Sequence, residues 1–135
     1  MKGYRLTFDK VSRDGSGKCD LEATGNPADR VWGVLFRIAA NEADALDDFE
    51  GLGEGYCKSE VQAMAQRGVS AAVAYFATKK DVTRLSYHWY RALVMAGAVE
   101  HELPAVYVEA IEKVASVQDP DARRRAEKEA ILCSS

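Results

Sequence analysis

"RVWGVLFRI", residues 30–38, is a nearly unbroken run of apolar, aromatic and β-branched residues. A strand that is buried on both faces of a sheet has this pattern, because both of its faces must contact other apolar groups. We therefore expect these residues to form the central strand of a sheet, and we place the rest of the chain around it.

Other strand signals lie on both sides of this run. "GYRLTF", residues 3–8, alternates apolar and polar side chains, as a half-buried strand does. The turn-rich "SRDGSGKCD" then favours a reversal into a second short strand near residues 18–23. Further along, "YCKSEVQAMA" and "VSAAVAYFAT" read as two strands joined at the turn "QRG". The sequence therefore predicts about five strands.

The second half of the chain changes to the period of a helix. One helix is expected in "SYHWYRALVMAGA", and Pro104 opens another at its tolerated first turn. The apolar residues at helical spacing are Tyr90, Leu93, Val94 and Gly97 in the first helix, and Tyr107, Ala110, Ile111 and Val114 in the second. A capping Asp119 precedes a last, largely charged segment, which we expect to be a surface helix or a frayed tail.

Strands followed by helices predict an α+β fold with a mostly antiparallel or mixed sheet. The chain of 135 residues is long enough for one compact core and too short for two ordinary domains. We assign residues 1–118 to the domain and residues 119–135 to the charged C-terminal helix or tail.

Composition excludes several classes of partner. The net charge is only −3 and no basic stripe is present, so we expect no nucleic acid. No apolar run approaches the roughly 20 residues that span a bilayer, and the first residues lack a signal-peptide core. We therefore expect no membrane and a cytoplasmic, soluble protein. The three scattered cysteines and two histidines form no metal-binding pattern, so we expect neither metal nor cofactor.

"LDDFEG", residues 46–51, contains the candidate catalytic group. A short helix is expected to begin at Asn41, and helical geometry turns Glu50 toward its packed face. A carboxylate that is partly withdrawn from water has a raised pKa and accepts protons more readily near neutral pH. The glycines that follow, Gly51 and Gly53 among them, let the backbone pass close to a bound molecule. Equally, Glu50 can be a boundary residue bonded to a backbone N–H, and the glycines only a turn.

Four stretches then resemble one family. "GYRLTFDKVSRDGSGKCDLE", "VWGVLFRI", "LDDFEGLGEGY" and "LVMAGAVEHELPAVYVEAI" have the order and spacing of the γ-glutamylcyclotransferase-like (AIG2-like) family, and the similarity runs from about residue 3 to residue 114. The resemblance implies a small mixed, barrel-like sheet of about five strands with helices outside. It also implies cyclisation of γ-glutamyl compounds to 5-oxoproline with release of an amine or amino acid.

The family's catalytic glutamate lies in its LDxxEG motif, so the resemblance assigns the acid/base role to Glu50. It also places Tyr56 and Tyr90 near the substrate, where each phenol could form a hydrogen bond. Both tyrosines can equally be core or rim residues of amphipathic elements. One carboxylate can deprotonate the attacking ammonium and then protonate the leaving nitrogen, so the reaction needs no metal.

Members of this family normally open with a strand and loop close to "YFAYGSNL", and this sequence contains no YGSN. Either the chain is a shortened product of a longer gene, or it is a natural short form. In both cases Glu50 lacks an expected partner, and activity depends on that loop being supplied. Loss of a first strand would uncover a sheet edge, so we expect a homodimer or a strand exchange that covers it.

Three functional hypotheses remain open on the sequence. The first is a γ-glutamylcyclotransferase-like enzyme acting on glutathione, a γ-glutamyl amino acid, or a γ-glutamyl amine or isopeptide. The second is a non-catalytic binding or assembly module of the same fold. The third is a transferase that acts on other amines and differs only in the leaving group.

Overall fold

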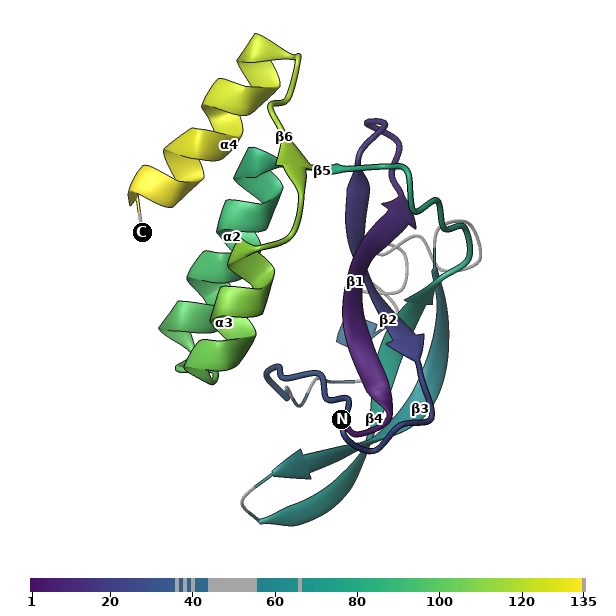
Figure 1. The fold of residues 1–135 in the computed structure, drawn as a ribbon. Helices are drawn as coiled ribbons and strands as arrows, with labels where there is room; N and C mark the ends of the chain where they lie inside the picture. The colour runs from purple at the N-terminus through teal and green to yellow at the C-terminus, as the bar shows by residue number, and fades with distance from the viewer. Residues whose placement is uncertain (36, 38, 40, 44–55, 66, 135) are drawn as a thin grey trace.

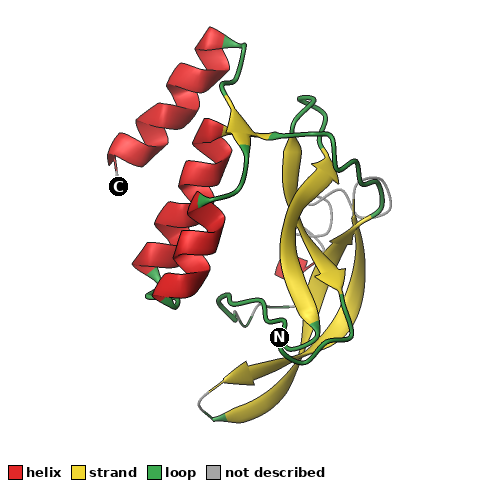
Figure 2. Ribbon diagram, viewed as in Figure 1, coloured by secondary structure: helices red, strands yellow, loops and turns green. Residues whose placement is uncertain are grey.

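The computed structural model describes residues 1–35, 37, 39, 41–43, 56–65 and 67–134 (Figure 1). Three helices lie together beside the longer strands (Figure 2). The strands are β1 (Tyr4–Val11), β2 (Gly17–Ala23), β3 (Tyr56–Ala65), β4 (Gly68–Ala77), β5 (Ser86–Tyr87) and β6 (Ser116–Val117). The helices are α2 (His88–Glu100), α3 (Ala105–Glu112) and α4 (Ala122–Ser134).

Two antiparallel hairpins carry the four long strands. In the first, β1 pairs with β2 from Tyr4 opposite Ala23 to Val11 opposite Gly17, with a register shift between Thr7 and Lys10. In the second, β3 pairs with β4 along their whole length. All four strands lie where the sequence predicts them, which confirms the strand predictions for residues 3–8, 18–23, 56–65 and 69–78.

The prediction of a central strand at residues 30–38 is wrong over the residues that the structure describes. Arg30 forms an isolated bridge to Lys2, but residues 31–35, 37 and 39 belong to no strand. The Val31 N–H donates to the Met1 carbonyl, and Tyr107 of α3 bonds to the Trp32 backbone. Residues 30–35 therefore contact the start of the chain on one side and α3 on the other, and they pair with no neighbouring strand beyond the single Lys2–Arg30 bridge. As a result, Trp32 remains 43% exposed and Leu35 53% exposed.

The barrel-like sheet is also corrected. Among the described residues the strands form three separate two-stranded sheets, which do not close into a barrel. The physical reason is the missing central strand, because no strand from the described residues 30–35 and 37 joins the β1–β2 hairpin to the β3–β4 hairpin. The predicted short helix after Asn41 is observed only at residues 41–43, and its continuation lies outside the described residues.

The helical part of the chain agrees with its sequence pattern. α2 and α3 occupy the two predicted segments, and Pro104 directly precedes α3. β5 and β6 form a short parallel pair beside the start of α2, with Ser86 opposite Ser116. The buried hydrophobic residues of the described chain are Val61, Tyr87, Trp89, Ala98 and Ile111. Most of this small core therefore lies in or beside the helices.

Asp119 fixes α4 against α2. Its carboxylate accepts a hydrogen bond from the Trp89 indole N–H at 2.8 Å and from two Arg124 nitrogens at 2.6 Å each. It also accepts the Asp121 backbone N–H at 2.9 Å. Asp119 is only 1% exposed. The bonds from Arg124, the strongest cause, together with those from Asp121 and Trp89, outweigh burial and hold the pKa of the Asp119 carboxyl far below its ordinary value.

β2 connects the two hairpins to each other and to the helical part. The Asp20 side chain is fully buried; its Oδ1 accepts the Ala77 N–H of β4 at 2.7 Å, and its Oδ2 lies 2.5 Å from the Lys80 ammonium. At Gly17, the N–H donates to the Leu85 carbonyl and the carbonyl accepts the Ser86 hydroxyl. A Cβ at position 17 would collide with the Phe8 carbonyl oxygen. Only glycine therefore fits at position 17, where β2 lies against the backbone of β1 and of residue 84.

Gly17→Ala is expected to destabilise the fold by about 2 kcal/mol or more, because the added methyl group must displace backbone. Gly97→Ala is the matched control: no atom lies within 4 Å of its added Cβ in α2, and alanine in a helix interior should raise stability by about 0.5–1 kcal/mol. Urea unfolding measures both. Equal stability of Gly17→Ala and the parent would contradict the close approach of the chain at this residue.

Asp119→Asn is expected to lower the free energy of unfolding by about 1–3 kcal/mol at pH 7, because buried donors lose their charged acceptor. The folded pKa of Asp119 is depressed, so its contribution is present above the unfolded pKa of about 4 and is lost as the pH falls further. The difference between variant and parent should therefore shrink below about pH 4. Urea unfolding at several pH values checks this.

Glu129→Gln, an exposed carboxylate-to-amide change on the same helix, is the control and should leave stability within about 0.5 kcal/mol of the parent. A constant difference between Asp119→Asn and the parent from pH 7 down to pH 2 would contradict the ionic role.

Candidate functional site

The candidate site residues fall into two groups. Glu50, Gly51 and Gly53 lie outside the residues that the structure describes. Tyr56 is the first residue of β3, and Tyr90 lies in the first turn of α2. Only the two tyrosines can therefore be placed from the coordinates, and Tyr56 comes directly after the segment that contains Glu50.

Tyr56 and Tyr90 meet at a single residue of β2. The Cys19 backbone N–H donates to the Tyr90 phenol oxygen at 3.0 Å. The Tyr56 hydroxyl donates to the Cys19 carbonyl at 3.2 Å. Tyr56 and Tyr90 follow Cys19 by 37 and 71 positions in the sequence, and the fold brings both to the same peptide segment. We call Cys19, Tyr56 and Tyr90, with Lys18 and Trp89 beside them, the tyrosine cluster.

Lysines and further rings surround the two tyrosines. The Lys18 ammonium lies 4.3 Å from the Tyr90 ring centroid and 4.5 Å from that of Trp89. The Lys10 ammonium lies 4.3 Å from the Tyr56 ring centroid. Cations over aromatic faces are favourable because the face of the ring is electron-rich. The tyrosine cluster therefore combines positive charge with aromatic walls, a combination suited to an anionic group on a small molecule.

Burial sets the protonation of the tyrosine cluster. Desolvation raises the pKa of the Cys19 thiol to about 11, although Tyr90 and Lys18 act in the opposite direction. Desolvation likewise raises the pKa of Tyr90; the charge and hydrogen bond of the Cys19 thiol add to this effect, whereas the hydrogen bond from the Cys19 backbone N–H acts in the opposite direction. Burial lowers the pKa of Lys18, which Asp14 at 3.4 Å partly offsets. Near neutral pH the thiol and the phenol are both protonated, so neither is a ready nucleophile.

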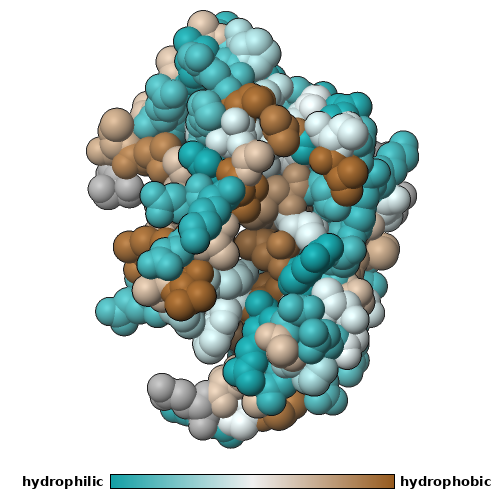
Figure 3. Space-filling model, in the orientation of Figure 1, coloured by the Kyte–Doolittle hydropathy of each residue, from teal (hydrophilic) through white to brown (hydrophobic). Residues whose placement is uncertain are grey.

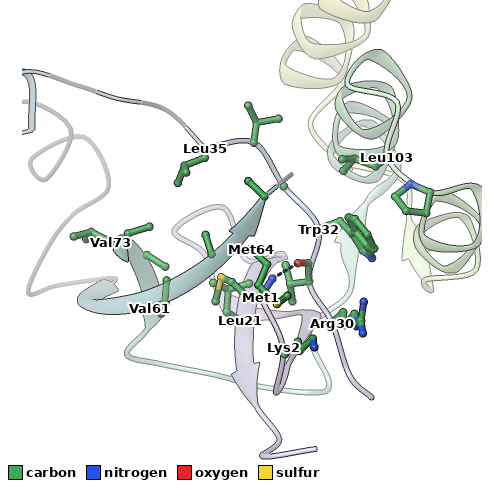
Figure 4. A pocket seen from close by; sticks show the side chains of 18 of the residues that line it. Met1, Lys2, Leu21, Arg30, Trp32, Leu35, Val61, Met64, Val73 and Leu103 are labelled. Atoms are coloured by element: carbon green, nitrogen blue, oxygen red, sulfur yellow. Dashed lines mark hydrogen bonds between the residues drawn. The ribbon is translucent and has the colours of Figure 1, made fainter. Parts of the chain in front are cut away.

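A second feature is an apolar hollow of about 770 Å³ between the strands and the helices. Figure 4 shows Val61, Met64 and Val73 of the β3–β4 hairpin bordering the same space as Trp32 and Leu103. Figure 3 shows apolar side chains gathered in the hollow between the helical part and the strands. Neither Tyr56 nor Tyr90 lines it. The apolar hollow and the tyrosine cluster are therefore separate features of the molecule.

The described part of the chain contains no group of three or more histidine, cysteine or acidic side chains that could hold a metal ion. None of the described helices is both long and apolar enough to cross a membrane.

Several residues of the tyrosine cluster were missed from the sequence. Cys19 is one of three scattered cysteines that form no metal-binding pattern in the sequence, and its backbone N–H and carbonyl bond to the two tyrosines in the structure. Trp89 falls outside the predicted apolar stripe of its helix, yet it is 5% exposed and contacts Lys18 and Asp119. The available signal was the density of aromatic residues in "SYHWY", since buried tyrosine and tryptophan need polar partners.

Known proteins resemble this chain in sequence. The model of the AIG2-like family matches residues 30–111. The γ-glutamylcyclotransferases of Homo sapiens and Mus musculus are 30% and 29% identical to it over 91 residues, which are 66% of this chain and 48% of each relative. The chain thus spans about half the length of these curated relatives.

Solved structures resemble it in fold. A γ-glutamyl cyclotransferase has a TM-score of 0.84 at 23% identity, over 100% of this chain and 82% of the other. An uncharacterized human protein has a TM-score of 0.83 at 24% identity, over 98% and 80% respectively. The chain therefore has the γ-glutamylcyclotransferase-like fold, which confirms the fold expected from the resemblance apart from the closed barrel.

The thiols provide a test of the tyrosine cluster. Cys57 and Cys133 are exposed, whereas Cys19 is half-buried and desolvation raises the pKa of its thiol to about 11. Ellman's reagent at pH 7.5 should therefore react promptly with two thiols per chain and with the third only after unfolding. Cys19→Ala should leave the prompt count at two. Three prompt thiols in the parent would contradict the burial of Cys19.

Proposed function

Because the chain belongs to the AIG2-like family, we propose that it acts on γ-glutamyl amides as a γ-glutamylcyclotransferase. In this proposal the free α-amine of the γ-glutamyl group attacks its own side-chain carbonyl carbon. The new C–N bond closes the five-membered ring of 5-oxoproline, and the bond to the leaving amine or amino acid breaks. The observation that carries the proposal is the family match over residues 30–111, which includes Glu50, with curated γ-glutamylcyclotransferases as relatives.

Glu50 is proposed as the acid/base. It takes a proton from the substrate ammonium, which exposes the lone pair that attacks, and it returns a proton to the leaving nitrogen. Folding the substrate so that its amine lies against its own carbonyl contributes the proximity effect. Atoms and charge balance without an external oxidant or reductant, because one amide bond replaces another.

The tyrosine cluster is proposed as the place where the substrate is held. Lys18 and Lys10 lie on the faces of Tyr90 and Tyr56 and bring positive charge to this region. A γ-glutamyl group carries an α-carboxylate that such charge favours. In this arrangement Tyr56 and Tyr90 position the substrate, and their bonds to Cys19 keep the two rings in fixed orientations. Gly51 and Gly53 are proposed to let the backbone approach the bound molecule.

A binding or assembly module of the same fold is the second candidate function. The observation that favours it is the apolar hollow, whose lining residues Trp32, Val34 and Leu35 remain exposed. An enzyme that binds a small polar substrate has no need for this apolar surface.

Glu50→Gln tests the proposal through release of 5-oxoproline from glutathione, a γ-glutamyl amino acid and a γ-glutamyl amine. Loss of the acid/base should lower release by about 10²-fold or more. Asp48→Asn is the matched control on the same segment, and it should retain parental activity because the sequence turns Asp48 to the opposite side of the expected helix.

Equal release by the parent and Glu50→Gln would overturn the assignment of the acid/base. No release by the parent from any of the three substrates would favour the binding module.

A further inference from the structure

A small crevice of about 200 Å³ lies between β1 and α3. Leu6 and Phe8 line it from β1, and Ala110 and Ile111 line it from α3. It shares only Arg30 with the apolar hollow and no residue with the tyrosine cluster. This space, which we call the β1–α3 crevice, is therefore a third feature of the molecule.

The floor of the β1–α3 crevice is apolar. Leu6 and Phe8 are two positions apart on β1, so the alternation of a strand turns both side chains to the face that meets α3. Ile111, which is 2% exposed, and Val114 face them from the helical side. An engineered cavity of about 150 Å³ lined by leucine, isoleucine and phenylalanine stays free of water and binds benzene. The crevice can therefore hold the apolar body of a ligand about as large as a benzene ring.

One positive charge at the rim of the crevice has no partner among the described residues. Arg30 is exposed and forms no ion pair with any of them. The backbone on both sides of it is fixed, because the Gly3 N–H donates to the Asp29 carbonyl at 2.9 Å and the Val31 N–H donates to the Met1 carbonyl at 3.0 Å. The Arg30 guanidinium is therefore carried by a fixed backbone and is available to an anion.

Arg5, the other arginine of the crevice, is already paired. Its guanidinium lies 2.5 Å from the Glu22 carboxylate, and Asp29 and Asp9 act on it more weakly. Because Glu22 offsets Arg5, one further negative charge, opposite Arg30, completes the charge balance. A monoanion therefore fits the crevice better than a dianion.

Tyr107 supplies a hydrogen-bond donor near Arg30. The Trp32 backbone bonds to the Tyr107 hydroxyl, which places this hydroxyl beside a segment only two residues from Arg30. Burial raises the pKa of Tyr107, and the bond from Trp32 acts in the opposite direction. The phenol is thus protonated near neutral pH, and no acceptor among the described residues takes its proton. A carboxylate can accept bonds from a guanidinium and a hydroxyl at the same time.

From this combination of an apolar floor, one unpaired cation and one hydroxyl donor, we propose that the β1–α3 crevice binds a small monocarboxylate with an apolar body, about the size of benzoate. The carboxylate bonds to Arg30 and to the Tyr107 hydroxyl. The apolar body lies between Leu6 and Phe8 on one side and Ile111 on the other. The proposal rests on the crevice alone and is independent of the proposed catalytic function.

Titration of benzoate into the ¹⁵N-labelled full chain, followed by NMR, tests this site. The amides of Arg30, Tyr107 and Ile111 should shift most, with a dissociation constant of about 1 mM. Benzamide has nearly the same shape without the charge, and it should bind about tenfold more weakly. Phe8 is a poor reporter, because its ring also packs edge-on against Tyr90 with 6.3 Å between the centroids.

Three variants separate charge from shape. Arg30→Gln should lower the affinity for benzoate about tenfold and leave that for benzamide unchanged. Arg123→Gln is the matched control: its side chain is 90% exposed on α4 and does not line the crevice, so benzoate should bind as in the parent. Ala110→Leu enlarges an exposed side chain of the crevice and should abolish binding of both ligands, while circular dichroism shows that each variant is folded.

The absence of saturable shifts at about 20 mM benzoate overturns the proposal. Equal affinities of the parent for benzoate and benzamide also overturn it, because the charge of Arg30 then has no part in binding. Shifts confined to residues 18–20, Tyr56 and Tyr90 do so as well, since the anion then lies at the tyrosine cluster. An equal loss of benzoate affinity in Arg30→Gln and Arg123→Gln contradicts a direct contact with Arg30.

Discussion

The backbone and side chains of β2 hold the other parts of this molecule together. The buried Asp20 carboxylate joins β2 to the end of β4 and to Lys80. One residue earlier, the Cys19 backbone forms hydrogen bonds with the phenols of Tyr56 in β3 and Tyr90 in α2. Gly17 allows the chain at Leu85 and Ser86 to cross closely enough for backbone bonding. Since the core of hydrophobic side chains is small, these polar contacts determine how the hairpins and helices are arranged.

This arrangement separates the two features on which the two candidate functions rest. On one side of the structure, the tyrosine cluster provides hydrogen-bonded rings, positive charge and a protonated phenol at Tyr90, the features on which the proposed binding of a small anionic molecule rests. Between the strands and the helices, the apolar hollow offers a surface that suits another polypeptide. The family relationship supports the proposal for the tyrosine cluster, and the exposed apolar residues support the proposal of a binding or assembly module at the apolar hollow.

Local patterns in the sequence predicted the local structure well. Alternation in residues 3–8, together with turn signals beside the other strands, placed the four strands of the two hairpins, and helical spacing placed α2 and α3, because such patterns depend only on neighbouring residues. The central strand at residues 30–38 failed because an apolar run shows that a segment avoids water and not which element it pairs with. The tyrosine cluster was predicted in part: Tyr56 and Tyr90 were named. Their meeting at Cys19 depends on contacts across 37 and 71 residues, which no local pattern contains.

The central claim is that a γ-glutamyl substrate is held at the tyrosine cluster, and NMR tests it most directly. Titration of a γ-glutamyl amino acid into ¹⁵N-labelled Glu50→Gln protein, which should bind without turnover, reports where the molecule lies. The account predicts that the largest amide shifts fall at residues 18–20, Tyr56 and Tyr90. Shifts confined to Met64, Val73 and Leu103 around the apolar hollow would contradict it, as would the absence of any shift at millimolar substrate.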